Sequence, residues 1–345
     1  MKLINRLGYC LAAGLPLIAL AACSGGGPSE PPPEVSSIVL DTVPTGDTAG
    51  IYIAADDGLF ARQGLNVKIV LVGGAGNGLG DLQTGKAELA EGNYVSFILA
   101  QIAGRFAAPD PADALVIGPP RPVDIRIIAD TSQMQPGNQA LYVMPDAPYK
   151  TVPDLVRDHA TVGVNQLHNV GTLLLGSLLA SFGYPVGAVR QVTAPLTQLP
   201  RLLARHEISA AWLPDPFGTE AEQEYGAVPL ADFDQGSLQN FPIGTVAGNA
   251  SWVRDHPRTV AAFLRAFEQG QQIADTNRAA AEQALLRNGV VPSRMVAATM
   301  TLPTYPLSMD VPEMQRVPDA MLEFGIIGRP YDITRMIQPE NGEVG

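Results

Sequence analysis

Short apolar runs alternate with helix-like segments along most of this chain, and this alternation limits its fold more than any other feature. The run Asn66–Val72 places Val, Ile and Leu at every second position, as a half-buried strand does. The segment Gly171–Phe182 is instead long and strongly apolar, as buried helices are. From Trp252 onwards the pattern is helical. Strands that alternate with helices, followed by a helical tail, predict an α/β protein with two lobes.

The predicted strand Ile208–Trp212 ends abruptly at Pro214 and Pro216. Proline lacks a backbone donor and disfavours helix in the preceding residue, so we expect the strand to stop near this point. Trp212 and Asp215 then lie at the carboxyl end of a strand, which is where ligands bind in open α/β sheets. Both residues have a second interpretation: Trp212 as a core residue, and Asp215 as a helix cap before a proline.

The first 22 residues form a predicted signal peptide. Lys2 and Arg6 precede an apolar run that is too short to span a membrane. Leu20-Ala-Ala-Cys23 resembles the lipobox of bacterial lipoproteins, which implies cleavage before Cys23 and lipidation of its thiol. The alternative is an ordinary signal peptide with a chance cysteine. Residues 23–36 are rich in Gly, Pro and Ser and are predicted to be a flexible tether.

Composition and motifs narrow the function. The formal net charge is −12, and the sequence has no basic stripe that could bind phosphates, so a nucleic-acid partner is not expected. Gly80–Lys86 matches a P-loop spacing, but Ala87 replaces the hydroxyl that binds magnesium. The four histidines show no metal-ligand spacing, and no catalytic signature is present. We therefore predict no metal, no cofactor and no catalytic residue.

Candidate ligand contacts lie at the predicted turns between strands and helices. Seven residues share this position: Thr48, Gly74, Asn77, Asn93, Tyr94, Thr131 and Asn165. Asn169, Gly171 and Thr172 open an apolar helix, whose backbone N–H groups and Thr172 hydroxyl could receive an anion. An ordinary turn or helix cap is the alternative at each position.

Several segments resemble one known family in order and spacing. They are Ile51–Phe60 with Gly64–Val67, Leu82–Ala90, Thr151–Leu155, Ala210–Phe217, and Trp252–Pro257 with Ala261–Ala266. With the lipobox, they resemble the solute-binding proteins of ABC importers in the nitrate, alkyl-sulfonate, taurine and thiamine-precursor group. Two departures are Glu88 in place of the usual Asp, and Asp215 in place of the usual Glu.

The resemblance implies a type II periplasmic-binding-protein fold with a cleft between its lobes. Lobe 1 is expected to comprise residues 37–140 and 246–345, and lobe 2 residues 141–245. Such a protein captures a small solute by lobe closure and delivers it to a membrane permease and its ATPase, without catalysis. It is expected to be extracytoplasmic and anchored to a bacterial membrane by its lipid.

The ligand remains open among sulfonates, nitrate, taurine and aminopyrimidines. The acidic Asp215 favours a ligand with an amino or amidine group. Two other functions fit the same residues: an enzyme on this fold, such as a pyrimidine synthase, or a sensory or structural lipoprotein without transport. The proline-rich segment 107–122 has no assigned role, and neither the oligomeric state nor the membrane that carries the anchor follows from the residues.

Overall fold

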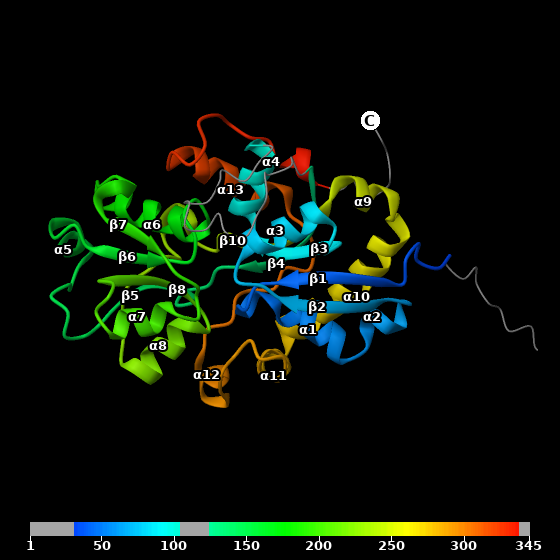
Figure 1. Ribbon diagram of the computed structural model, residues 1–345, viewed down its shortest axis with the longest axis horizontal. Helices are drawn as coiled ribbons and strands as arrows, with labels where there is room; N and C mark the ends of the chain where they lie inside the picture. Colours follow the sequence, from blue (N-terminus) through cyan, green and yellow to red (C-terminus); the bar gives the residue numbers. More distant parts are fainter. Residues whose placement is uncertain (1–30, 104–123, 338–345) are drawn as a thin grey trace, which may run out of the picture. The chain divides into compact units, whose positions relative to one another are not determined.

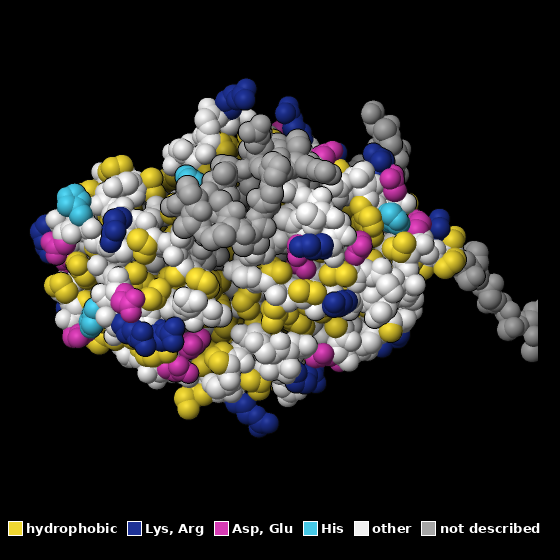
Figure 2. Space-filling model, in the orientation of Figure 1, with side chains coloured by type: hydrophobic (Ala, Val, Ile, Leu, Met, Phe, Trp, Pro, Cys, Tyr) yellow, Lys and Arg dark blue, Asp and Glu magenta, His cyan; other side chains and the backbone are white. Residues whose placement is uncertain are grey.

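The computed structural model describes residues 31–103 and 124–337. The predicted signal peptide 1–22, Cys23 and the proline-rich segment 107–122 lie outside the described residues. Within the described ranges, no helix is long and apolar enough to cross a membrane. On the face seen in Figure 2, Lys and Arg side chains lie among Asp and Glu side chains, so charge of both signs is spread over it.

The first sheet contains five strands, which are labelled in Figure 1. They are β2 (Asn66–Leu71), β1 (Ser37–Thr42), β3 (Leu89–Asn93), β10 (Pro242–Asn249) and β4 (Ile125–Gln133), in this spatial order. Strand β1 is parallel to both β2 and β3, whereas β10 is antiparallel to both β3 and β4. The last strand in sequence therefore lies inside the sheet.

The second sheet also has five strands. Their spatial order is β7 (Arg190–Thr193), β6 (Thr161–Val164), β8 (Ala210–Pro214), β5 (Gln139–Val143) and β9 (Val228–Asp232). The chain passes between the sheets from β4 to β5 and returns from β9 to β10. The two crossings lie within a few residues of the lobe boundaries expected at 140/141 and 245/246, whose extents stay a prediction.

Helices flank both sheets. The first lobe has α1 (Ala49–Asp56), α2 (Leu59–Arg62), α3 (Ala75–Thr84) and α4 (Tyr94–Ala103); the second has α5 (Val152–Arg157), α6 (Val170–Ser181), α7 (Leu199–Ala204) and α8 (Phe217–Tyr225). The tail contains α9 (Ala250–Asp255), α10 (Pro257–Thr276), α11 (Arg278–Arg287), α12 (Arg294–Thr299) and α13 (Val311–Glu323). Short 3₁₀ turns occur at Gly46–Thr48, Val186–Ala188, Gly236–Leu238 and Ile333–Met336.

The tail helix α10 is built into the first lobe. It packs with α1 and α2 on one face of the first sheet, while α3 and α4 cover the other face (Figure 1). Phe60 of α2 stacks on Phe263 of α10 with ring centroids 5.2 Å apart. Gly270 approaches the Gly50 carbonyl and lies so near Ala54 that an added Cβ would be 3.0 Å from the Ala54 methyl. This close approach explains why glycines stand at the α1–α10 crossing.

Three elements differ from the expectation. Strand β4 continues through Gln133, so Thr131 lies inside a strand and not at a turn, because this segment pairs with β10. Strand β8 begins at Ala210 and includes Pro214, which is tolerated as its last residue. Strand β10 was not predicted at all. Its sequence contains Pro and two Gly residues and shows no clear alternation of apolar and polar residues.

The end of the predicted tether 23–36 is fixed at the start of α10. The Glu34 carboxylate accepts the backbone N–H groups of Arg258 (3.0 Å) and Thr259 (2.7 Å). A carboxylate at a helix N-terminus satisfies free N–H groups and opposes the positive end of the helix dipole. The tether therefore differs from the expectation at its last residues, which are bound to the first lobe.

Candidate functional site

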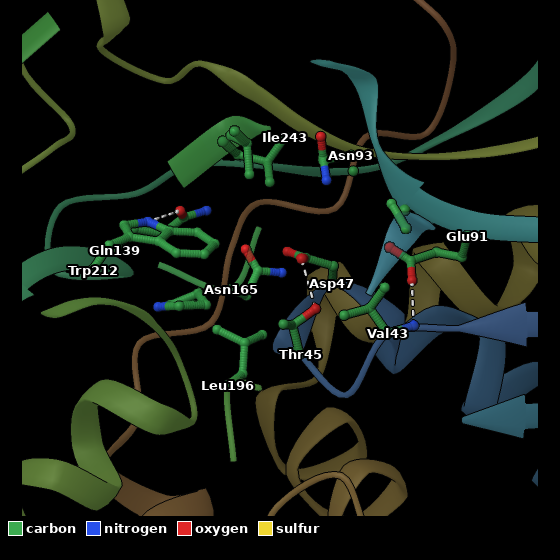
Figure 3. A pocket seen from close by; sticks show the side chains of 15 residues that line it. Val43, Thr45, Asp47, Glu91, Asn93, Gln139, Asn165, Leu196, Trp212 and Ile243 are labelled. Carbon is green, nitrogen blue, oxygen red and sulfur yellow. Dashed lines mark hydrogen bonds between the residues drawn. The ribbon is translucent and has the colours of Figure 1, made fainter. Parts of the chain in front are cut away.

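A small cavity of about 30 Å³ lies where residues of the two sheets meet. Figure 3 shows its walls. From the first lobe come Val43, Thr45, Asp47, Ala75, Glu91, Gly92, Asn93, Ile243 and Gly244; from the second come Gln139, Asn165, Val170, Leu196, Trp212 and Pro214. Such a space holds only a few water-sized groups. In this arrangement, the facing side chains nearly fill the space between the lobes.

The loop after β1 forms one wall of the cavity. Thr45 and Asp47 flank the start of the 3₁₀ turn, and the Thr45 hydroxyl donates to Asp47 Oδ2 (2.7 Å). The Thr48 hydroxyl donates to the Thr45 carbonyl (2.9 Å) and is fully buried. Thr48 therefore stabilises the turn that presents Asp47 and does not line the cavity.

Glu91 lies in β3 with only 1% of its surface exposed. Its Oε2 accepts the backbone N–H of Val43 (2.9 Å), which ties β3 to the loop after β1. Burial, and next the charge of Asp47, raise the pKa of Glu91 well above 4.5. Burial also raises the pKa of Asp47, against the opposing effect of the Thr45 and Ser132 hydroxyls. The two carboxyls thus share one poorly solvated space.

Trp212 forms the opposite wall. Its Nε1–H donates to Gln139 Oε1 (3.1 Å), which fixes the ring edge between β8 and β5. Its ring packs on Gly171 at the start of α6, where an added Cβ would lie 2.6 Å from Trp212 Cε3. Trp212 is 3% exposed, so it serves both as a core residue and as a cavity wall. Gly171 positions the ring and does not itself line the cavity.

Two asparagines present amide nitrogens to the cavity. Asn165 Oδ1 accepts a hydrogen bond from Asn169 Nδ2 (2.5 Å), and Asn93 Oδ1 accepts the backbone N–H of Ser96 (2.9 Å). With both oxygens engaged, the nitrogens point inward, and Asn165 faces Asp47 across the cavity (Figure 3). These groups are donors for a ligand.

The expected anion seat at α6 is already occupied. Asn169 caps this helix, because its Oδ1 accepts the Gly171 N–H (3.0 Å). The Thr172 hydroxyl donates to Gln191 Oε1 (3.0 Å). The cap thus satisfies the Gly171 N–H group, while Val170, the first residue of the helix, lines the cavity.

The N-terminus of α3 is covered from the second lobe. Gln166 contacts Gly76, and a Cβ added at Gly74 would lie 3.3 Å from Gln166 Oε1. Gln166 Oε1 is buried without a hydrogen-bond partner in the described part of the chain. Its side chain packs against the start of α3, whose first residue, Ala75, lines the cavity.

Asp215 does not line the cavity. Its Oδ1 accepts the Thr219 N–H (2.9 Å) at the start of α8, and its Oδ2 accepts the Thr301 N–H (2.5 Å). Its carbonyl accepts the N–H of Gly46 from the first lobe (3.3 Å). Burial raises the pKa of Asp215 to about 6. The carboxylate has the capping geometry of its second interpretation and also joins α8 to the tail.

Of the candidate residues, Asn93, Asn165 and Trp212 line the cavity. The others lie beside it or behind it: Thr48, Gly74, Asn77, Tyr94, Thr131, Asn169, Gly171, Thr172 and Asp215. Asp47, Glu91 and Gln139 were missed. Asp47 and Glu91 lie close in sequence to the candidates Thr48 and Asn93, so acidic residues beside the predicted turns were the available signal. Within residues 31–103 and 124–337, no cluster of three or more His, Cys, Asp or Glu residues is placed to hold a metal ion.

Solved structures match the fold over most of the chain. The alkanesulfonate-binding protein SsuA from Xanthomonas axonopodis pv. citri, bound to MOPS, matches with a TM-score of 0.69 and 14% identity over 88% of this chain and 99% of its own. The periplasmic nitrate-binding protein NrtA from Synechocystis PCC 6803 matches with a TM-score of 0.70 and 16% identity over 89% and 87%. A ligand-binding component of an ABC-type import system from Staphylococcus aureus, with zinc bound, matches with a TM-score of 0.70 and 13% identity over 88% and 97%.

At these identities the structural matches show a shared fold, which is the predicted periplasmic-binding-protein fold. A comparison with curated proteins found no match. The model of the NMT1-like family matches residues 31–287, which include both sheets and the loops that line the cavity. The chain therefore belongs to the NMT1-like family.

Proposed function

We propose that the protein is the extracytoplasmic solute-binding component of an ABC importer. The observation that carries this proposal is the cavity, whose walls come from both sheets. A solute held there contacts both lobes at once, so its binding energy favours the closed arrangement. Solved proteins with this fold include binding components named for alkanesulfonate and nitrate.

Closure requires that the lobes move about the two crossings between the sheets, β4 to β5 and β9 to β10. Hinged closure around a ligand needs only a few connecting residues to change conformation. The small size of the cavity then limits the part of a solute that the lobes enclose in this arrangement. We propose Asn93, Asn165 and Trp212 as ligand contacts, together with Asp47 and Glu91.

The remaining candidates position these contacts. Thr48 supports the turn at Asp47, Gly171 supports Trp212, and Asn169 holds Asn165. We further propose that Cys23 carries a lipid that keeps the protein near its permease and ATPase, and that the segment which follows Cys23 is the tether. Substitution of Cys23 by Ser should abolish incorporation of labelled palmitate and release the protein from the membrane. Retention of both label and membrane attachment would contradict the anchor.

Solute binding can be tested before the ligand is identified. Residues 24–345 are dialysed against a defined mixture of sulfonates, nitrate, taurine, aminopyrimidines, alkylammonium and guanidino compounds. Solutes retained by the protein are then measured by mass spectrometry. We expect one solute class to be retained at about one molecule per chain. Retention of no member of any class would contradict the proposed function.

The two tryptophans supply a matched pair of variants for this assay. Trp212 lines the cavity, whereas Trp252 of α9 stacks on His256 with ring centroids 4.6 Å apart. Trp212→Phe should weaken binding by about 10-fold or more, since large aromatic contacts dominate many binding sites. Trp252→Phe should leave the affinity unchanged. Equal effects of the two substitutions would place the binding site elsewhere.

A further inference from the structure

The cavity between the lobes has a one-sided charge. Asp47 and Glu91 are its acidic residues, and none of the described residues that line it is Lys, Arg or His. Glu91 Oε2 is held by the Val43 N–H, while its other oxygen points toward the cavity in Figure 3. An anion placed here would meet two carboxyl groups and no cation. Since an anion would repel whichever of these carboxyls is ionised and would find no cation beside it, the arrangement opposes nitrate and sulfonates.

Two helices begin at this cavity, at Ala75 of α3 and Val170 of α6, and side chains already engage part of each helix start. Gln166 covers the N-terminus of α3, and Asn169 caps α6, whose first turn is also covered by the Trp212 ring. Backbone N–H groups at helix ends are the usual seats for anions in proteins that lack a nearby cation. The side-chain donors on the cavity walls include the neutral amides of Asn93 and Asn165, and none of them carries a positive charge.

The rest of the cavity suits an organic group. Val43, Leu196 and Ile243 supply apolar surface, and Trp212 supplies an aromatic ring. The face of a Trp ring attracts cations, most strongly where water is excluded. A hydrated metal ion would not use these apolar contacts, whereas an organic cation uses both them and the carboxyls.

We propose that the solute is a small organic cation, an ammonium or amidinium compound that also carries a neutral hydrogen-bond acceptor. Its charged N–H groups bind Asp47 and Glu91, and its acceptor binds the amides of Asn93 and Asn165. This inference rests on the proposed function and deepens it by naming the class of solute. Binding of the cation favours the ionised carboxyls and removes the repulsion between them.

The charge class is tested by dialysis of wild type and an Asp47→Asn/Glu91→Gln double variant against matched probes. The cationic probes are glycinamide, ethanolamine, acetamidine, methylguanidine and protonated aminopyrimidines; the others are acetamide, methylurea, taurine, nitrate and ethanesulfonate. We expect wild type to retain a cation and the double variant to bind it at least about 30-fold more weakly. Asp57→Asn, an exposed carboxylate after α1, should bind like wild type.

Each other outcome overturns a definite part of the scheme. Retention of an anion or neutral probe, with equal or tighter binding by the double variant, would overturn the cation and leave solute binding intact. Retention of a cation with unchanged affinity in the double variant would overturn the roles of Asp47 and Glu91. Retention of no probe by wild type would overturn the proposed function as well.

A second measurement needs no ligand. Because Glu91 is uncharged below its raised pKa, its ionisation opposes folding as the pH rises above 4.5, the value for an exposed Glu. Glu91→Gln removes that penalty and should raise the midpoint of thermal unfolding by a few degrees at pH 8, with little change at pH 4.5. A midpoint that is unchanged or lower at both pH values would contradict the raised pKa of Glu91.

Discussion

Gly171 supports the Trp212 wall, and its replacement by Ala tests this packing directly. The added Cβ would lie 2.6 Å from Trp212 Cε3 and 2.8 Å from Cδ2. Carbon atoms in contact prefer separations of about 3.5–4.0 Å, so the ring must move by about 1 Å. That movement strains the hydrogen bond from Trp212 Nε1 to Gln139 Oε1. Overpacking of this kind costs about 1–3 kcal/mol.

Gly176 provides a matched control in the same helix. A Cβ added there would meet Val186 at 3.6 Å and Phe324 at 3.8 Å, which are ordinary contacts. Ala in place of Gly inside a helix gains up to about 1 kcal/mol. Gly176→Ala should therefore be neutral or stabilising, and Gly171→Ala should be less stable than it by about 2 kcal/mol or more.

Two assays measure this prediction. Urea unfolding gives the free energies of the two variants relative to wild type. Fluorescence reports the ring itself, because the chain has only two tryptophans and Trp252→Phe leaves Trp212 alone. We expect a changed emission maximum and weaker solute binding for Gly171→Ala only. If Gly171→Ala matches Gly176→Ala in stability, emission and affinity, the ring does not depend on Gly171 and this description of the wall is wrong.

Three further substitutions test other contacts. Asp215→Ala leaves the Thr301 N–H without its acceptor and removes a helix cap, so urea unfolding should show a free energy of unfolding lower by about 2–4 kcal/mol. A decrease of less than about 1 kcal/mol would contradict both roles. Gly270→Ala drives a methyl group into the Gly50 backbone and should lower the unfolding free energy by about 3 kcal/mol or more, unless the α1–α10 crossing is looser than described. Burial raises the pKa of Asp130 from 3.8 to about 7, so ionisation of this residue destabilises the folded state as the pH rises across this range. Asp130→Asn should flatten the pH dependence of the unfolding free energy by an amount on the order of 4 kcal/mol. An unchanged pH profile would refute the shift.

Local sequence patterns were sufficient for much of the fold. The strands Ser37–Thr42, Gln139–Val143 and Thr161–Val164 are compact apolar runs between turn residues, which is the pattern that predicts a strand. Strand β10 escaped prediction because its interior position comes from pairing with β3 and β4, which are far away in sequence. Gly248 illustrates the difficulty: it looks like a turn residue, yet an added Cβ would lie 2.8 Å from the Val253 side chain.

The site was less predictable because its walls come from different lobes. The turn positions predicted Asn93, Asn165 and Trp212 as ligand contacts, and all three line the cavity, since the loops that follow strand ends face the ligand in this fold class. Which turn residue faces the cavity is decided by packing across the lobes. Gln166 of the second lobe covers Gly74 of the first, and no local pattern connects these two residues. Contacts between residues of different lobes can be recognised only when the positions of both sheets are known.

The proposed cation must ionise the carboxyls of the cavity, and the protons released on binding measure this directly. Calorimetric titration of the retained solute at pH 6, in buffers with different ionisation enthalpies, gives the number of protons exchanged per molecule bound. Because the pKa of Glu91 is raised in the free protein, cation binding should release protons from wild type and release fewer from Glu91→Gln. Proton uptake, or no exchange in either protein, would contradict the binding of a cation by these carboxyls.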